Sequence, residues 1–345
     1  RSSTRSPCNP MAKLLFPGRG CCAACDVQIL LRLCQTCHED LLFFRPALVE
    51  ALVFSLEHGD PDSWCSALRA LGALADPASE RVLESLARCL TGPEKWLRPH
   101  VVFAFTELAR RGGAAAITVA SISIFKQPDV DIRCSVLKLL EQAAKFGEPA
   151  ASMEIARALE DENADVRRTA ISMLAELTGH SHAKQLSMIT QQVASYLEHE
   201  NLSVRDAAMS ALTCIAVVAN TAVIAAVASR LKHRDSGVRR TAVQVLQLLS
   251  FESPDEISSV LACLEHSDPE VRCSALQALG ELVDTGKQQI EVALLPLLDD
   301  VDESVRTLAS KMLERLSCQR ARRLKRKCRA TSRASAELIP APVLS

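Results

Sequence analysis

One thirteen-residue pattern, typified by residues 268–280, occurs eight times in the chain at a nearly constant spacing. An acid or amide is followed by two variable residues, an aliphatic residue, an arginine, and then small and large apolar residues at helical spacing. The eight copies place at the arginine position Trp64, Arg98, Arg133, Arg167, Arg205, Arg239, Arg272 and Arg306, with steps of 34, 35, 34, 38, 34, 33 and 34 residues. A period of this length predicts a stacked array of repeated units.

The residues around the arginine position predict a capped, amphipathic helix in each copy. Four residues earlier lies a good N-cap residue, such as Asp129, Asn201 or Asp268, except that the second copy has Glu94. Apolar residues one before, three after and seven after the arginine position form one face of a helix. A second apolar stripe precedes each copy, as in residues 257–264. Each unit is therefore predicted to be a helical hairpin, and stacking the hairpins buries a continuous core.

The pattern Asp-x-x-Val-Arg-x-x-Ala-x-x-x-Leu resembles the HEAT repeat, especially the short repeats of phycocyanobilin-lyase-like HEAT proteins. The resemblance covers residues 46–317 and implies an all-α, right-handed α-solenoid of about eight helical hairpins. In such proteins aspartate and arginine side chains form a ladder across successive turns, and the second helices of the hairpins line the concave surface. The resemblance assigns this ladder to Asp129, Asp235, Asp268, Asp302, Arg98, Arg133, Arg167, Arg205, Arg239, Arg272 and Arg306.

Three parts are predicted along the chain: a cysteine-rich leader with a capping helix (1–40), the solenoid (41–318) and a basic, disordered tail (319–345). The chain starts at an arginine, and Met11 is an alternative start. The tail has eight basic residues and one acid, although the net charge of the chain is −1, so the solenoid is acidic. An acidic solenoid does not track nucleic acid along its length. The tail itself is interpreted as a nuclear localisation signal or as a contact for nucleic acid or an acidic protein.

Two Cys-x-x-Cys pairs in the leader leave two interpretations open. Cys22 with Cys25 and Cys34 with Cys37 could supply four thiolates to zinc, but only eight residues separate the pairs. The alternative is a capping helix with free thiols in a reducing compartment. Cys34 also begins a Cys-x-x-Cys-His string of the c-type haem kind, with no haem-pocket context around it. No cofactor or metal is predicted for the solenoid.

The cysteines of the solenoid follow the repeat. Cys65, Cys134 and Cys273 come directly after the arginine position, and equivalent positions in stacked hairpins are too far apart for a disulfide. We therefore expect free thiols and a cytoplasmic location, with the nucleus as the alternative.

Histidines also follow the period, six residues before the arginine position. His58, His199, His233 and His266 are predicted to end the first helix of each hairpin, where imidazole meets the negative end of the helix dipole. Iron-dependent enzymes of the deoxyhypusine hydroxylase type are the enzymatic alternative, because they share the repeat length. Their paired His-Glu dipeptides are missing after the arginine position, and His199-Glu200 falls in a turn, so this alternative is disfavoured.

Residues 207–229 carry no charge and are long enough to span a bilayer. They nevertheless contain Ala208 and Leu212 in register with the repeat, and Asn220-Thr221 falls where a turn between hairpins belongs. The segment is therefore predicted to be two buried helices, without a membrane. Proline follows Arg98, so the second hairpin is expected to be the least regular.

The function predicted from these features is that of a non-catalytic scaffold or adaptor. The second helices offer neither a nucleophile with a base nor a phosphate-binding glycine loop, so no catalytic residue is predicted. Binding of partner proteins is assigned to the concave face, at positions five residues after the arginine position: Arg69, Phe103, Lys138, Gln244, Gln277 and Lys311. A nucleic-acid-associated protein that uses the basic tail remains an alternative.

Overall fold

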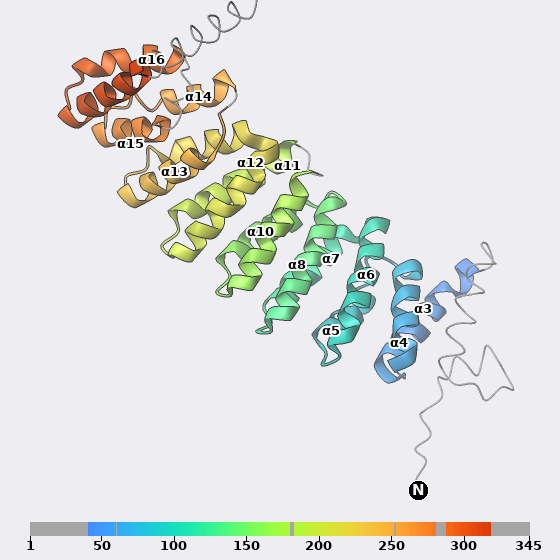
Figure 1. Cartoon of the computed structure of the whole chain (residues 1–345). Coiled ribbons are helices and arrows are strands. Elements are labelled where there is room, and N and C mark those ends of the chain that lie inside the picture. Colours follow the sequence, from blue (N-terminus) through green and yellow to red (C-terminus); the bar gives the residue numbers. More distant parts are fainter. Residues whose placement is uncertain (1–40, 60, 180–182, 252, 281–287, 319–345) are drawn as a thin grey trace, which may run out of the picture. The chain divides into compact units, whose positions relative to one another are not determined.

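The structure is a computed structural model that describes residues 41–318, apart from 60, 180–182, 252 and 281–287. Every regular element in these residues is a helix (Figure 1). The predicted leader, with Cys22, Cys25, Cys34 and Cys37, and the predicted basic tail lie outside the described residues.

The helices follow one another as eight hairpins. The first helices are α3 (Leu41–His58), α5 (Glu80–Thr91), α7 (Ala114–Phe125), α9 (Pro149–Arg157), α11 (Ala183–Ser195), the second part of α12 (Leu202–Arg230), α14 (Pro254–Leu261) and α16 (Gln288–Leu294). The second helices are α4 (Pro61–Leu74), α6 (Arg98–Leu108), α8 (Val130–Lys145), α10 (Ala164–Thr178), the first part of α12, α13 (Ser236–Leu248), α15 (Pro269–Leu279) and residues 303–318. The predicted all-α class of about eight helical hairpins is confirmed.

Short 3₁₀ or π segments join or extend these helices. They are η1 (Lys95–Leu97), η2 (Ala109–Gly113), η3 (Ala158–Glu160), η4 (Tyr196–Glu198) and η6 (Leu295–Asp299), of which η2 is the π segment. Single turns of this kind are common where an α-helix starts or ends.

The hairpins form two compact units, which divide between Ile189 and Thr190. In unit 1 the first helices α3, α5, α7 and α9 pack successively on one another, and the second helices α4, α6, α8 and α10 do the same. In unit 2 α12, α13 and α15 pack in succession, and α12 also contacts α14. Unit 1 therefore consists of two layers of helices with an apolar core between them, as hairpins with one apolar face require.

The periodic apolar positions make up this core. The residue three after the arginine position is fully buried in every hairpin: Ala67, Val101, Val136, Ala170, Ala208, Ala242, Ala275 and Ala309. Most of these residues are alanine, which lets neighbouring helices approach closely. Gly72 shows the same effect, because a Cβ atom there would lie 3.1 Å from Ala104 Cα on the next second helix.

The second hairpin departs from the regular geometry at its proline, as expected. The α-helix α6 begins at Arg98, and Pro99 lies in its first turn, where a missing N–H costs little. The turn that would have preceded it is the 3₁₀ segment η1. The helix is therefore shortened at its start. A further kink follows it in η2, at Gly112, whose φ of 101° is one that glycine adopts readily.

The uncharged segment forms helix α12, which is the helix in the described residues long and apolar enough to cross a membrane. Its backbone breaks at Ala219 (φ −125°, ψ 43°), next to the turn predicted at Asn220. The side chain of Asn220 donates to Glu256 Oε1 of the next hairpin at 3.0 Å. Val223 and Ile224, after the break, are fully buried inside unit 2. The segment thus has the structure of two core helices of successive hairpins.

Candidate functional site

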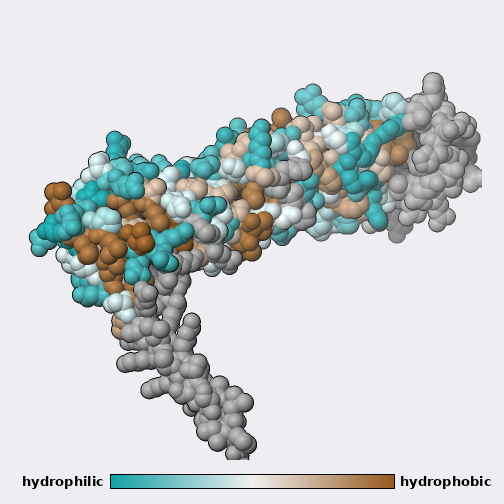
Figure 2. Space-filling model, turned by 90° about the horizontal axis from the view of Figure 1, so that it is seen from above, coloured by the Kyte–Doolittle hydropathy of each residue, from teal (hydrophilic) through white to brown (hydrophobic). Residues whose placement is uncertain are grey.

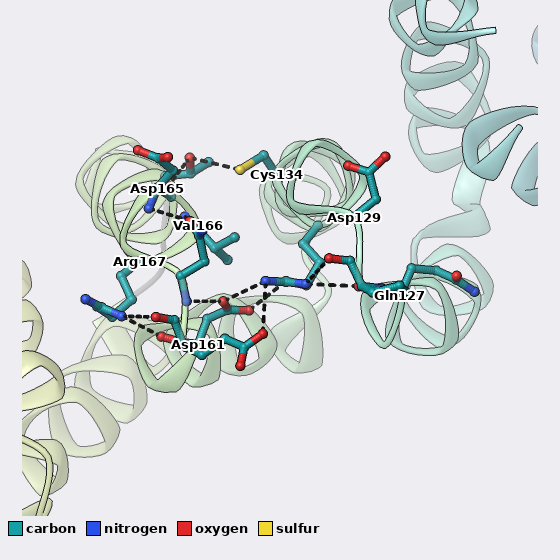
Figure 3. Close-up of polar contacts among 12 residues, drawn as sticks. Gln127, Asp129, Cys134, Asp161, Asp165, Val166 and Arg167 are labelled. Atoms are coloured by element: carbon teal, nitrogen blue, oxygen red, sulfur yellow. Dashed lines mark hydrogen bonds and ion pairs between the residues drawn. The ribbon is translucent and has the colours of Figure 1, made fainter. Parts of the chain in front are cut away.

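In six of the eight hairpins, the arginine at the arginine position ties the second helix to the turn before it. Arg133 Nη1 donates to the carbonyl oxygens of Gln127 (3.1 Å) and Pro128 (2.9 Å), six and five residues earlier (Figure 3). Five other arginines donate to the carbonyls at the same two offsets: Arg167, Arg205, Arg239, Arg272 and Arg306. These turn carbonyls thereby have a hydrogen-bond partner within the protein.

The other side of the same guanidinium reaches the next hairpin. Arg133 Nε lies 2.9 Å from Asp161 Oδ2, and Arg133 Nη2 donates to Asp161 Oδ1 at 3.1 Å. Asp161 also accepts the backbone N–H of Asn163 at 2.8 Å, and its carbonyl accepts from Arg167 at 2.8 Å (Figure 3). One aspartate therefore joins the arginine of one hairpin to the turn and the arginine of the next.

The carboxylate that pairs across hairpins is not always the N-cap residue to which the sequence analysis assigned it. Asp129 does pair with Arg98 at 3.1 Å. The N-cap residues Asp235, Asp268 and Asp302 instead accept the amide two residues later in their own helix, at 2.6, 2.9 and 2.9 Å. The carboxylates that meet the remaining paired arginines are Asp161 with Arg133, Glu270 with Arg239 and Asp300 with Arg272.

The pKa shifts of two of these carboxyls agree with this pairing. Burial raises the pKa of Asp300, but hydrogen bonds from Arg272 and from the Asp302 amide outweigh it, so the pKa is lowered overall. Burial likewise raises the pKa of Asp129, which hydrogen bonds from Arg98 and from the Asp131 amide lower overall. Both side chains are thus held in the charged form.

Histidines take the place of aspartate in three of the turns. The Nδ1 atoms of His199, His233 and His266 accept the backbone N–H two residues later, at 3.0, 3.1 and 3.1 Å. Asp161 and Asp300 accept the equivalent amide at 2.8 and 2.9 Å. This hydrogen bond replaces the dipole contact that we expected for these histidines. Within the described ranges, no group of three or more His, Cys, Asp or Glu residues is arranged to hold a metal ion.

A histidine in this place offers the preceding arginine no carboxylate. Arg239 faces the turn of His266 and pairs with Glu270 instead, on the first turn of α15. Arg205 faces the turn of His233, where glycine stands at the position equivalent to Glu270. In the part of the chain that the structure describes, no carboxylate lies within ion-pair distance of Arg205.

The six residues predicted to bind partners all have exposed side chains. In unit 1 these are Arg69, Phe103 and Lys138, and in unit 2 Gln244, Gln277 and Lys311. We call each set of three the second-helix face of its unit. Phe103 is 46% exposed, which is unusual for a side chain of this size.

The hydroxyl residues two after the arginine position contribute less to this face. Ser135, Thr169, Thr241 and Ser274 are half-buried and donate to the carbonyl four residues earlier in their own helix, at 2.8 to 3.0 Å. Their donor capacity is therefore already used.

A cleft of about 510 Å³ in unit 1 adjoins Lys138, and α6, α8 and η1 line it. Lys95 on its wall donates to Asp131 at 2.8 Å, and this hydrogen bond raises the pKa of Lys95. Lys138 has no ion-pair or hydrogen-bond partner among the described side chains. The charge of Lys138 is therefore available to a ligand at this edge of the second-helix face.

Cysteines of the solenoid are free thiols, including Cys65, Cys134 and Cys273. Burial raises the pKa of the Cys89 thiol to about 11 and also raises that of Cys273. A raised pKa keeps a thiol protonated at neutral pH and so lowers its reactivity as a nucleophile.

An exposed apolar surface lies on the last described hairpin. Figure 2 shows hydrophobic side chains among hydrophilic ones at the end of unit 2 that carries α16. The exposed apolar side chains of α16, η6 and the following turn are Val292 (60%), Leu295 (54%), Leu298 (37%) and Val301 (97%).

Stacked helical hairpins with a repeated arginine turn define a helical-repeat protein. Residues 257–286 match the family model of the HEAT repeat. Residues 144–227 match the model of the non-SMC mitotic condensation complex subunit 1. Both matches support a protein of the HEAT-repeat superfamily.

Comparisons with individual proteins give weaker similarities. No curated protein matches the sequence. The chain is similar to the crystal structure of an engineered protein, with 18% identity, a TM-score of 0.34 and 78% of each chain covered. It is also similar to the karyopherin Kap121p, solved with the extreme C-terminus of the phosphatase Cdc14p, with 16% identity, a TM-score of 0.42 and coverage of 79% of this chain and 34% of that one. Because the identities and TM-scores are low, neither match bears on what this chain binds.

Proposed function

We propose that the protein is a non-catalytic scaffold that binds partner proteins through the second-helix face of each unit. The observation that carries the proposal is a regular contrast along the second helices. The residue five after the arginine position is exposed in every hairpin, whereas the residue three after it is fully buried in every hairpin. Within each unit, successive hairpins therefore present one outward side chain each, in a row with the spacing of stacked helices, ~8–10 Å.

The chemistry of the row differs between the units. In unit 1 two cations, Arg69 and Lys138, flank the exposed ring of Phe103. Such a row fits a partner segment with acidic residues on both sides of an apolar one, because rim charges steer association while an aromatic ring supplies contact area. In unit 2 Gln244 and Gln277 suit backbone hydrogen bonds to an extended segment.

The family matches support a role in assembly. The model matched by residues 144–227 is described as that of a subunit of a multi-protein complex. For location we propose the cytoplasm, with entry to the nucleus through the basic tail as the alternative.

Charge reversal on the proposed face tests this function. Arg69→Glu, Lys138→Glu and Lys311→Glu are combined in one full-length variant. A control carries the same change of charge at Lys126, Lys184 and Lys232, which are exposed outside the second-helix face. Proteins retained by the wild type and by the control, but lost from the face variant, are expected in quantitative affinity capture. Equal retention by all three proteins would contradict the proposal.

A further inference from the structure

An open pocket of about 250 Å³ lies in unit 1, at the turn between α5 and α6. Trp64 of α4 and Leu97 of η1 line it, together with Glu57 of α3 and residues 85–94 in part. Trp64 occupies the arginine position of the first hairpin, so this hairpin lacks the guanidinium that its equivalents use. The pocket is separate from the second-helix face.

The aromatic part of the site is a pair of indole rings. Trp64 and Trp96 stack with their ring centroids 6.4 Å apart and an angle of 13° between the planes. Trp96 is 51% exposed, so part of its ring faces solvent beside the pocket. Tryptophan has the aromatic ring that binds cations best, through the negative charge of its face.

The acidic part of the site is Glu94, which lines the pocket and is half-buried. It stands at the N-cap of η1 but makes no side-chain capping hydrogen bond. Its carboxylate has no ion-pair or hydrogen-bond partner among the described residues. Binding of a cation stabilises a carboxylate that is partly removed from water and unpaired.

The remaining groups leave a single negative charge in the pocket. Arg88 and Glu57 pair at 2.5 Å and neutralise each other. The Cys89 thiol stays protonated because burial raises its pKa to about 11. Lys95, beside Glu94 in the chain, pairs with Asp131 outside the pocket. The charge balance therefore favours a cationic ligand over an anionic one.

The lining of the pocket also contains a hydrogen-bond donor that needs an acceptor, the indole N–H of Trp64. The indole Nε1–H of Trp64 is buried and has no hydrogen-bond partner among the residues that the structure describes. A ligand that brings a carbonyl oxygen together with a cation would satisfy it, since a buried donor without a partner is costly. A peptide offers both groups at a short distance, as a side chain and a backbone carbonyl.

From these observations we infer that the pocket lined by Trp64 and Glu94, with Trp96 at its edge, binds an arginine side chain of a partner protein. The planar guanidinium stacks on an indole face and offers two parallel donors to a carboxylate, which the ammonium of lysine cannot do. The backbone carbonyl of the bound arginine accepts from Trp64 Nε1. This site holds a single residue of a partner and does not depend on binding at the second-helix face.

Intrinsic fluorescence provides a direct test, because Trp64 and Trp96 are the two tryptophans of the entire chain. The full-length protein is titrated with the peptide acetyl-Gly-Arg-Gly-amide, and with matched peptides that carry citrulline or lysine instead of arginine. We expect a saturable change in tryptophan emission with the arginine peptide. Loss of the charge in citrulline is expected to weaken binding about tenfold, and the lysine peptide is expected to lie between the two.

A pair of variants assigns the effect to the pocket. Glu94→Gln is expected to weaken binding of the arginine peptide about tenfold. The control Glu84→Gln removes an exposed carboxylate from α5, outside the pocket, and should leave binding unchanged. If Glu94→Gln does not fold, as judged by its circular dichroism, Trp96→Ala takes its place with calorimetry as the readout.

Three outcomes would overturn the inference: no saturable change with the arginine peptide, equal binding of the citrulline peptide, or wild-type binding by Glu94→Gln. None of them depends on the affinity capture that tests the second-helix face. The two proposals can therefore fail separately.

Discussion

Arg133 Nε lies 2.9 Å from Asp161 Oδ2 in the next hairpin, and the two side chains are only 7% and 8% exposed. Removing both charges from water is costly, and the mutual attraction offsets that cost only when the remaining polar atoms are also bonded. Here the turn carbonyls of Gln127 and Pro128 accept from the guanidinium, and the Asn163 amide donates to the carboxylate. The pair therefore fixes the register of one hairpin on the next.

Removal of one charge of the Arg133–Asp161 pair should show how strongly the stability of unit 1 depends on the pair. Asp161→Ala leaves the Arg133 charge buried without its counter-charge, and we expect a loss of ~3–5 kcal/mol in the free energy of unfolding. Glu162→Ala, at the next residue, is the control, because the Glu162 side chain is 90% exposed and lies 4.0 Å from Arg133. Urea denaturation followed by tryptophan emission measures both, since both tryptophans lie in unit 1 with Asp161. Similar losses for the two variants would show that burial of the pair is unimportant.

The histidine turns make a second prediction. His266→Leu removes the acceptor of the Asp268 amide and should cost ~1 kcal/mol. His266→Asp keeps an acceptor of the kind that Asp300 provides in the next turn, and should cost much less. Hydrogen exchange at the Asp268 amide is the measurement, and it should be faster in the leucine variant alone. Unchanged protection in that variant would mean that the imidazole acceptor is dispensable.

A buried carboxyl in unit 1 predicts how stability depends on pH. Burial and the neighbouring Glu176 raise the pKa of Glu141, and Lys145, with Nζ 2.5 Å away, opposes the shift. A folded-state pKa above the unfolded value means that Glu141 favours folding while it is protonated. This contribution is present below the unfolded pKa and is lost as pH rises through the folded pKa.

Glu141→Gln keeps the uncharged shape at every pH, so it isolates this contribution. The stability of the wild type relative to Glu141→Gln should fall as pH rises from 4 toward 8. Urea midpoints of the two proteins across that range provide the measurement, and Glu84→Gln serves as the exposed control. A relative stability that rises with pH would contradict the direction of the pKa shift.

The periodic core makes a prediction in unit 2. Leu246 is 1% exposed, whereas Leu248 in the same helix is 64% exposed. Leu246→Ala should cost ~2–5 kcal/mol, because a cavity is added to the lost transfer free energy. Leu248→Ala should change stability by less than ~0.5 kcal/mol. Thermal unfolding followed by circular dichroism compares them, and equal shifts would exclude the predicted apolar face.

Much of the fold could be predicted because local physics repeats in every hairpin. N-cap residues such as Asn163 and Asp268 cap their helices as their side chains predict, and each needs only its own first turn. The apolar positions depend only on helical geometry. Even the break at Ala219 was anticipated to within a residue, because Asn220 interrupts the register of the repeat.

Cross-hairpin contacts could not be predicted in the same way. Three positions in each turn, the N-cap and two residues on either side of it, can place a carboxylate within reach of the preceding arginine. Which one pairs depends on angles between hairpins that no local pattern contains. A separation of 28 residues, shared by Arg133 with Asp161 and by Arg272 with Asp300, is the signal that could have found two of these pairs. The stacking of Trp64 on Trp96 could not be predicted either, because the two residues belong to different hairpins.

Arg205 donates to the carbonyl oxygens of its own turn. In the described residues, no carboxylate in the turn of His233 lies within ion-pair distance of Arg205. Hairpins laid in a row respond to tension like springs in series, where the softest coupling lengthens first. When a bound partner pulls on unit 2, we therefore expect the contact between Arg205 and the turn of His233 to separate first. The ion pairs that Glu270 and Asp300 form with Arg239 and Arg272 should separate later. Gly237 in place of a glutamate, together with an imidazole in place of a carboxylate, then decides where unit 2 extends first.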